Sequence, residues 1–268
     1  DLYRKAGDRL NAGIESDAIG TIFQLRGRYG AALKVKTEAL KNVRESGENG
    51  YWMATVLGGY GQTLALAGRG QEADEPLTQA LAIARRLGNP ALVAQVLAQQ
   101  GDRLFYAGDV RGARTLYRQA VQAASGLADR RFRLIAELGE ARTAVAGGAS
   151  AAAVPTLRAV TAAAGELGLK DLVAESSLYL GQALFATKDH AAARRQLEDA
   201  ISRSERLGML SLRARSHYLL ALLLTDARED TEAARHLAAA RRVLAEMTSE
   251  AKMDSLAQRS DLKPIGAE

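Results

Sequence analysis

The stretch LYLGQALFATKDHAAARRQLEDA, residues 178–200, decides the expected fold of this chain. Its first part is a helix-forming run with Leu180 and Gly181 at its centre, and its second part carries Ala193 and Ala200. Two alanines seven residues apart lie on one face of a helix, two turns apart, where they allow a neighbouring helix to approach closely. Asp189 between the two parts is typical of a helix cap. The stretch therefore predicts two helices joined by a tight turn.

The same pattern recurs along the whole chain. The second alanine of each pair stands at 39, 80, 120, 159, 200 and 240, and these positions are 41, 40, 39, 41 and 40 residues apart. A glycine precedes the first alanine by five residues in four units, and Lys188 and Arg228 take its place in the last two. Glycine supplies the positive φ of a tight turn at a helix end, so we expect the turns at Gly27, Gly68, Gly108 and Gly147.

The repeat predicts an all-α fold, an α-solenoid of about six antiparallel helix hairpins with a C-terminal capping helix. We expect one repeat domain over 1–268, with units at 8–46, 48–87, 89–125, 129–167, 170–207 and 209–246 and the cap at 249–258. Residues 1–6 resemble the end of a second helix, and the chain begins without Met, so we expect it to be a fragment of a longer protein. The tail from Arg259 onward is expected to be loose.

Composition limits the classes of function. Apolar residues make up 47% and charged residues 25% of the 268 residues, which is globular composition. There is no cysteine, which excludes disulfides and thiolate metal sites and fits a cytoplasmic protein. No run approaches the roughly 20 apolar residues of a membrane span, so no membrane contact is expected. The net charge of +5 is small and interleaved with acids, so nucleic-acid binding is the weaker alternative.

These residues resemble the tetratricopeptide repeat, whose signature runs from an aromatic through Leu-Gly to two spaced alanines. The fifth unit carries it best, with Leu180-Gly181, Leu184, Ala193, Leu197 and Ala200. In the fourth unit Gly139 and Glu140 fall where Leu-Gly is expected, so that unit is degenerate. The resemblance implies a right-handed superhelix of the long-repeat type found in bacterial signalling proteins, where such arrays bind proteins, self-associate or sense a regulator. HEAT-type repeats share the period and are the alternative fold.

The resemblance also implies a binding surface, because the first helices of tetratricopeptide units line a concave groove. Transferring the family's groove-facing offsets to this sequence selects polar and aromatic side chains that suit an extended peptide. The candidate partner-binding residues are Gln24, Gln62, Gln95, Gln99, Asp102, Tyr106, Glu137, Glu175, Tyr179, Gln182, Arg215 and Tyr218.

No constellation of residues points to catalysis, a metal or a cofactor. The three histidines, His190, His217 and His236, have no metal-ligand spacing, and no nucleophile elbow or phosphate loop is present. The sequence thus predicts a protein- or peptide-binding scaffold without enzymatic activity, the interaction or sensing region of a larger bacterial regulator. Self-association is the main alternative, which would make the protein a homo-oligomer, and a small-molecule effector between hairpins stays open.

Overall fold

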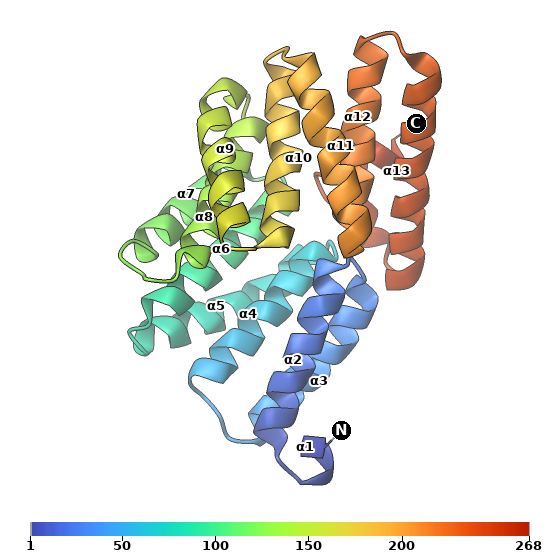
Figure 1. Cartoon of the computed structure of the whole chain (residues 1–268). Helices are drawn as coiled ribbons and strands as arrows, with labels where there is room; N and C mark the ends of the chain where they lie inside the picture. The colour runs from blue at the N-terminus through green and yellow to red at the C-terminus, as the bar shows by residue number, and fades with distance from the viewer. Residues whose placement is uncertain (1, 268) are drawn as a thin grey trace.

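The computed structural model describes residues 2–267, and almost all of this range is helical (Figure 1). After the short helix α1, helices follow one another as antiparallel pairs. The pairs are α2 (Arg9–Leu25) with α3 (Tyr29–Glu45), α4 (Tyr51–Leu66) with α5 (Gly70–Arg86), α6 (Pro90–Tyr106) with α7 (Val110–Ala123), α8 (Arg130–Ala146) with α9 (Ser150–Glu166), α10 (Lys170–Ala186) with α11 (His190–Leu207), and α12 (Leu210–Asp226) with α13 (Asp230–Ala251). The remaining elements are α1 (Leu2–Lys5), the 3-10 helix η1 (Asp254–Gln258) and α14 (Lys263–Gly266).

The pairs stack into a curved α-solenoid, which confirms the all-α fold predicted from the sequence. The first helices of successive pairs pack against one another, and each also packs on its own second helix. The curvature brings the two ends of the array together, since the amide of Leu210 donates to the carbonyl of Arg26 over 3.3 Å and α13 contacts α3. Figure 1 shows the hairpin α2–α3 next to the C-terminal helices.

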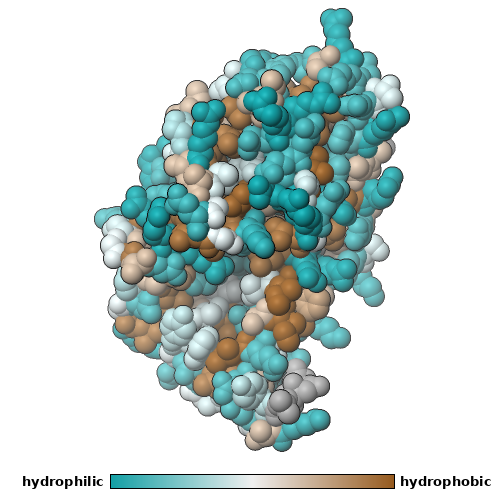
Figure 2. Space-filling model, in the orientation of Figure 1, coloured by the Kyte–Doolittle hydropathy of each residue, from teal (hydrophilic) through white to brown (hydrophobic). Residues whose placement is uncertain are grey.

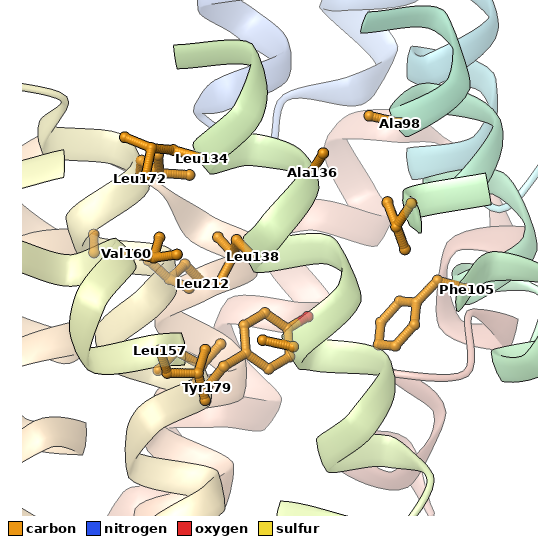
Figure 3. Packing of buried hydrophobic residues seen from close by; sticks show 14 of the residues in the cluster. Ala98, Phe105, Leu134, Ala136, Leu138, Leu157, Val160, Leu172, Tyr179 and Leu212 are labelled. Carbon is orange, nitrogen blue, oxygen red and sulfur yellow. The ribbon is translucent and has the colours of Figure 1, made fainter. Parts of the chain in front are cut away.

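Small residues and leucines fill the space between the helices. The paired alanines of the second and fifth units, Ala73 with Ala80 and Ala193 with Ala200, are fully buried. Figure 3 shows buried hydrophobic residues of this core, among them Phe105 and Tyr179, whose rings meet edge-on at a centroid distance of 6.4 Å. The core thus extends without a break from one hairpin to the next, as a solenoid requires.

The register of the fourth hairpin differs from the prediction by one residue. The left-handed turn residue is Gly148, with φ of 83°, whereas Gly147 ends α8 with φ of −85°. The buried positions of α9 are accordingly Ala153 and Val160, whereas the predicted alanines, 152 and 159, are exposed. The prediction was wrong because two glycines stand side by side and a valine replaces the second alanine of the pair.

The C-terminal segment also departs from the prediction. No separate helix covers 249–258, because α13 continues to Ala251, Lys252 then adopts a left-handed conformation, and η1 follows. The tail is not loose: Leu262 and Ile265 are fully buried, and Arg259 is 2% exposed. Arg259, Leu262 and Ile265 stand three residues apart, but they lie outside the 40-residue repeat, so the repeat pattern does not mark them as part of the core.

Candidate concave binding site

A cavity of about 430 Å³ opens on the concave side of the solenoid. All six first helices, α2, α4, α6, α8, α10 and α12, contribute lining residues. Eight of the twelve residues selected from the sequence lie on its wall, namely Gln24, Gln62, Gln95, Gln99, Asp102, Tyr106, Glu175 and Arg215. The repeat places the inner faces of all first helices side by side, which is why residues 191 positions apart in sequence (24 and 215) line one cavity.

Four of the selected residues, Glu137, Tyr179, Gln182 and Tyr218, lie outside the lining. Glu137 pairs with Arg133 of its own helix at 2.7 Å. Tyr179 is only 1% exposed and belongs to the core, where the guanidinium of Arg215 lies 4.7 Å from its ring centre. Gln99 and Tyr179 stand at the same position of the repeat, two hairpins apart. Gln99 lines the cavity, whereas Tyr179 is buried because Arg215 covers that part of the inner face.

A row of side-chain amides runs along the cavity wall. Gln24 donates from Nε2 to Oε1 of Gln62 over 3.1 Å, and Gln62 donates from Nε2 to Oδ2 of Asp102 over 2.6 Å. These residues come from α2, α4 and α6, so each hydrogen bond joins neighbouring hairpins. A row of amides with spare donors and acceptors is suited to bonding an extended peptide backbone.

Arg142 of α8 lies at the centre of the polar wall, and sequence reasoning did not select it. It is 4% exposed and bonds to Asp102, to Tyr117 and, over 3.2 Å, to Glu175. Burial opposes its charge, but the oxygens of Tyr117 and Asp102 outweigh this cost and raise the pKa of the guanidinium well above its usual value. The site therefore holds a permanent cation that fixes the positions of its carboxylates.

A second buried cation lies closer to the N-terminus. The ammonium of Lys36 is 2.8 Å from Oδ1 of Asp17 and 3.0 Å from the hydroxyl of Thr21, and its side chain is 1% exposed. Gly20 makes room for it, since a Cβ there would lie 2.6 Å from Cγ of Lys36. The two buried cations thus compensate neighbouring carboxylates of the wall.

Part of the cavity rim is apolar. Leu25 is 42% exposed, Ile135 is 37% exposed, and both line the cavity together with the half-buried Phe132. Figure 2 shows hydrophobic surface near the middle of one face, surrounded by hydrophilic residues. Exposed aliphatic side chains beside a cavity are typical of surfaces that bind a partner.

Neither a metal-binding cluster nor a membrane-spanning helix is found in the described part of the chain. Among residues 2–267 no three His, Asp or Glu side chains converge in a way that could hold a metal ion. Within the same range no helix combines the length and the apolar character that a bilayer crossing needs.

His217 of α12 and His236 of α13 form a pair whose Nδ1 atoms are 2.8 Å apart, a hydrogen bond in which the accepting ring must be neutral. Burial, together with His236 and Arg213, lowers the pKa of His217 to about 4, and burial lowers the pKa of His236. The unfolded chain therefore binds more protons than the native chain at pH values below the ordinary histidine pKa. Stability is fully present above that pKa and is lost as the pH falls toward the folded-state value.

We expect the free energy of unfolding to fall by on the order of 1 kcal/mol between pH 7 and pH 5, after allowance for solvent screening of these half-exposed rings. Replacing both histidines by glutamine should remove this part of the pH dependence in urea unfolding curves. His190, which lies 3.4 Å from Asp226 on the surface, supplies the control substitution. An unchanged pH dependence in the double variant would contradict the assignment.

Comparisons with known proteins agree with this geometry. Residues 11–86 match one tetratricopeptide-repeat family model and residues 173–207 match a second. Both stretches thus match tetratricopeptide repeats, and the described range as a whole has the stacked helix hairpins of that fold. A comparison with curated protein sequences finds no match.

Several solved structures share the fold. A Rap protein complexed with competence and sporulation factor superposes with a TM-score of 0.69 at 13% identity, over 93% of this chain and 66% of that protein. Aspartyl phosphate phosphatase F from Bacillus subtilis gives 0.56 at 10% identity, over 81% and 59%. A signal-transduction ATPase of Pyrococcus horikoshii with a tetratricopeptide sensor gives 0.54 at 15%, over 91% and 38%. This chain thus spans just under two thirds of the Rap protein, and identities this low show the fold alone.

Proposed function

We propose that this chain is a scaffold that binds an extended peptide segment of a protein partner in its concave cavity, as the interaction or sensing region of a larger bacterial regulator. The observation that carries the proposal is the hydrogen-bonded row of the amides Gln24 and Gln62 and the carboxylate Asp102, beside the aliphatic side chains of Leu25 and Ile135. The amides offer hydrogen bonds to a peptide backbone, and the rim offers apolar contact to its side chains. Tetratricopeptide folds generally serve as scaffolds and not as enzymes.

Two of the similar structures support this role. The Rap protein was solved in complex with a factor, and the Pyrococcus protein carries its repeats as a sensor. The lining charges also favour a peptide over nucleic acid. Asp17, Asp102, Asp129, Asp171 and Glu175 give five acids against the four bases Lys36, Arg131, Arg142 and Arg215. A phosphate backbone would need a basic excess at this surface.

The test is selection of peptides from a displayed random library on the immobilised chain, followed by titration of the selected peptides. Tyr106 and Tyr179 are too buried for informative substitution, so the variant is Gln95→Ala with Ile135→Ser, which changes two accessible lining residues. Losing one hydrogen bond and one apolar contact should weaken binding by about 2 kcal/mol, roughly thirtyfold.

The matched control is Gln79→Ala with Leu222→Ser, which changes exposed residues of α5 and α12 outside the cavity. This control should bind the selected peptides as the original chain does. Equal affinity of the lining variant would refute the groove assignment. Failure to select any peptide, together with a mass in sedimentation that rises with concentration, would favour self-association instead.

A further inference from the structure

The segment 252–265 crosses the interior of the solenoid. Its apolar side chains Leu256, Leu262 and Ile265 are fully buried in a cluster that also contains Tyr29 of the first hairpin and Leu64 of the second. The segment itself has little regular structure, only the five residues of η1 and the start of α14. Its own backbone hydrogen bonds form only short turns, so contacts with distant hairpins hold the segment in place.

Several of these contacts are hydrogen bonds to carbonyls at the ends of α4 and α6. Ser255 donates from Oγ to the carbonyl of Ala67 over 2.9 Å. Ser260 donates from its amide to Tyr106 over 3.0 Å and from Oγ to Phe105 over 2.9 Å. The last carbonyls of a helix have no partner among the helix's own amides, and the segment supplies donors to those of Ala67 and Tyr106. Gly68 allows the approach, because a Cβ there would overlap the carbonyl of Ser255.

Arg259 joins four hairpins with one side chain. Its guanidinium donates to the Tyr29 hydroxyl over 3.3 Å, to the Leu66 carbonyl over 2.7 Å and to Oγ of Ser211 over 3.4 Å. It also lies 4.2 Å from the centre of the Tyr106 ring. These groups belong to α3, α4, α12 and α6, so this one side chain contacts the first three hairpins and the last one.

Asp261 completes the charge balance. Its Oδ2 lies 2.8 Å from Nη2 of Arg259 and 3.3 Å from Nε of Arg215, and its side chain is 6% exposed. Although burial acts against its charge, the two guanidiniums lower the pKa of the Asp261 carboxyl, so it stays ionised near neutral pH. Breaking such a buried pair leaves a charge without compensation, which is strongly unfavourable.

One further contact closes the ring of hairpins just before the segment. Glu250 accepts hydrogen bonds from the amides of Gly30 and Ala31 over 3.2 and 3.0 Å. These amides belong to the first turn of α3, whose own preceding residue, Arg28, offers no side-chain cap. The last helix pair thus caps the first one across the ring.

We propose that residues 252–265 form an intramolecular clasp that holds the first and last hairpins together and thereby sets the width of the concave cavity. Tyr29, Leu66, Tyr106, Ser211 and Arg215 line the cavity and also contact the clasp. Opening the clasp widens the cavity, and by thermodynamic linkage a ligand that fits the closed cavity stabilises the clasp. The closure stands independently of any ligand, whereas its effect on binding rests on the proposed function.

The absence of cysteine in the chain makes closure directly measurable. Cysteines replace the exposed residues Lys34 of α3 and Arg242 of α13, carry spin labels, and report the distance between the first and last hairpins by pulsed electron paramagnetic resonance without ligand. We expect one narrow distance distribution for the original chain. Arg259→Ala should shift it to longer distances and broaden it, and Asp261→Asn should do so to a smaller extent. The control, Arg235→Ala, changes an exposed arginine of α13 and should leave the distribution unchanged.

Circular dichroism checks that each variant keeps its helices. If Arg259→Ala unfolds, the distance distribution of Asp261→Asn alone tests the clasp. Distributions of both variants that match the original chain would overturn the clasp. A peptide selected on the original chain should bind more weakly to Asp261→Asn. Unchanged affinity despite a longer distance would overturn the link between clasp and cavity, and this result is distinct from a failure to select any peptide, which concerns the proposed function alone.

Discussion

Replacing Gly139 by alanine should lower the free energy of unfolding by about 2–3 kcal/mol, the upper range for an overpacked core. A Cβ at Gly139 would overlap carbon atoms of the Tyr117 ring, which is 1% exposed. The ring cannot retreat, because Gly101 of α6 lies against it as well, and a Cβ there would be 2.6 Å from its Cε1. The Tyr117 hydroxyl also donates to Oδ1 of Asp102 over 2.7 Å, so displacing the ring disturbs the polar wall of the cavity.

Gly165 provides the matched control, because it lies near the end of α9 and a Cβ added there would meet no atom within 4 Å. Alanine there should raise stability by about 0.5 kcal/mol, since it reduces the entropy of the unfolded chain without a clash. Urea unfolding followed by far-UV circular dichroism measures both variants. If Gly139→Ala stayed within about 0.5 kcal/mol of the original chain, the ring would be free to move, contrary to this packing.

The fourth hairpin, to which Gly139 belongs, also shows which parts of the fold could be predicted from the sequence and which could not. The recurring alanines and turn glycines predicted helix pairs throughout the chain, because close helix packing and positive φ restrict residue choice at those positions. In the fourth hairpin these signals were ambiguous. With Gly148 as the turn residue, the left-handed residues of the turns within hairpins, at 68, 108, 148, 188 and 228, are evenly 40 residues apart. Ala141 then takes the glycine place of Leu-Gly, as Ala221 does in the sixth hairpin.

The candidate site was predictable only where the register of the repeat was correct. Gln62, Asp102 and Arg142 stand at equivalent positions, 40 residues apart, and family offsets found the first two. The error of one residue in the fourth hairpin placed Ala141 at this position, so Arg142 was missed. Arg259 comes from a segment without any repeat, and its burial depends on four hairpins meeting in space. No local pattern encodes such a meeting.

Arg142→Met should have the largest effect on stability, a loss of about 3–5 kcal/mol, because it leaves the carboxylates of Asp102 and Glu175 without their buried cation. Methionine keeps most of the side-chain volume, so the loss reports charge more than packing. Adding Asp102→Asn removes one of the uncompensated charges while the side chain can still accept from Tyr117. The double variant should therefore recover about 1–2 kcal/mol relative to Arg142→Met.

The matched control is Arg118→Met, which removes an exposed arginine that lies 2.8 Å from Glu140 on the surface. Its loss should be below about 1 kcal/mol, since solvent screens such pairs. Urea unfolding at neutral pH measures all three variants. Equal losses for Arg142→Met and Arg118→Met would mean that water reaches the cavity wall and screens the Arg142 network. An Asp102→Asn addition that deepened the loss would show that Asp102 is stabilised by its bonds to Gln62 and Tyr117 more than by Arg142.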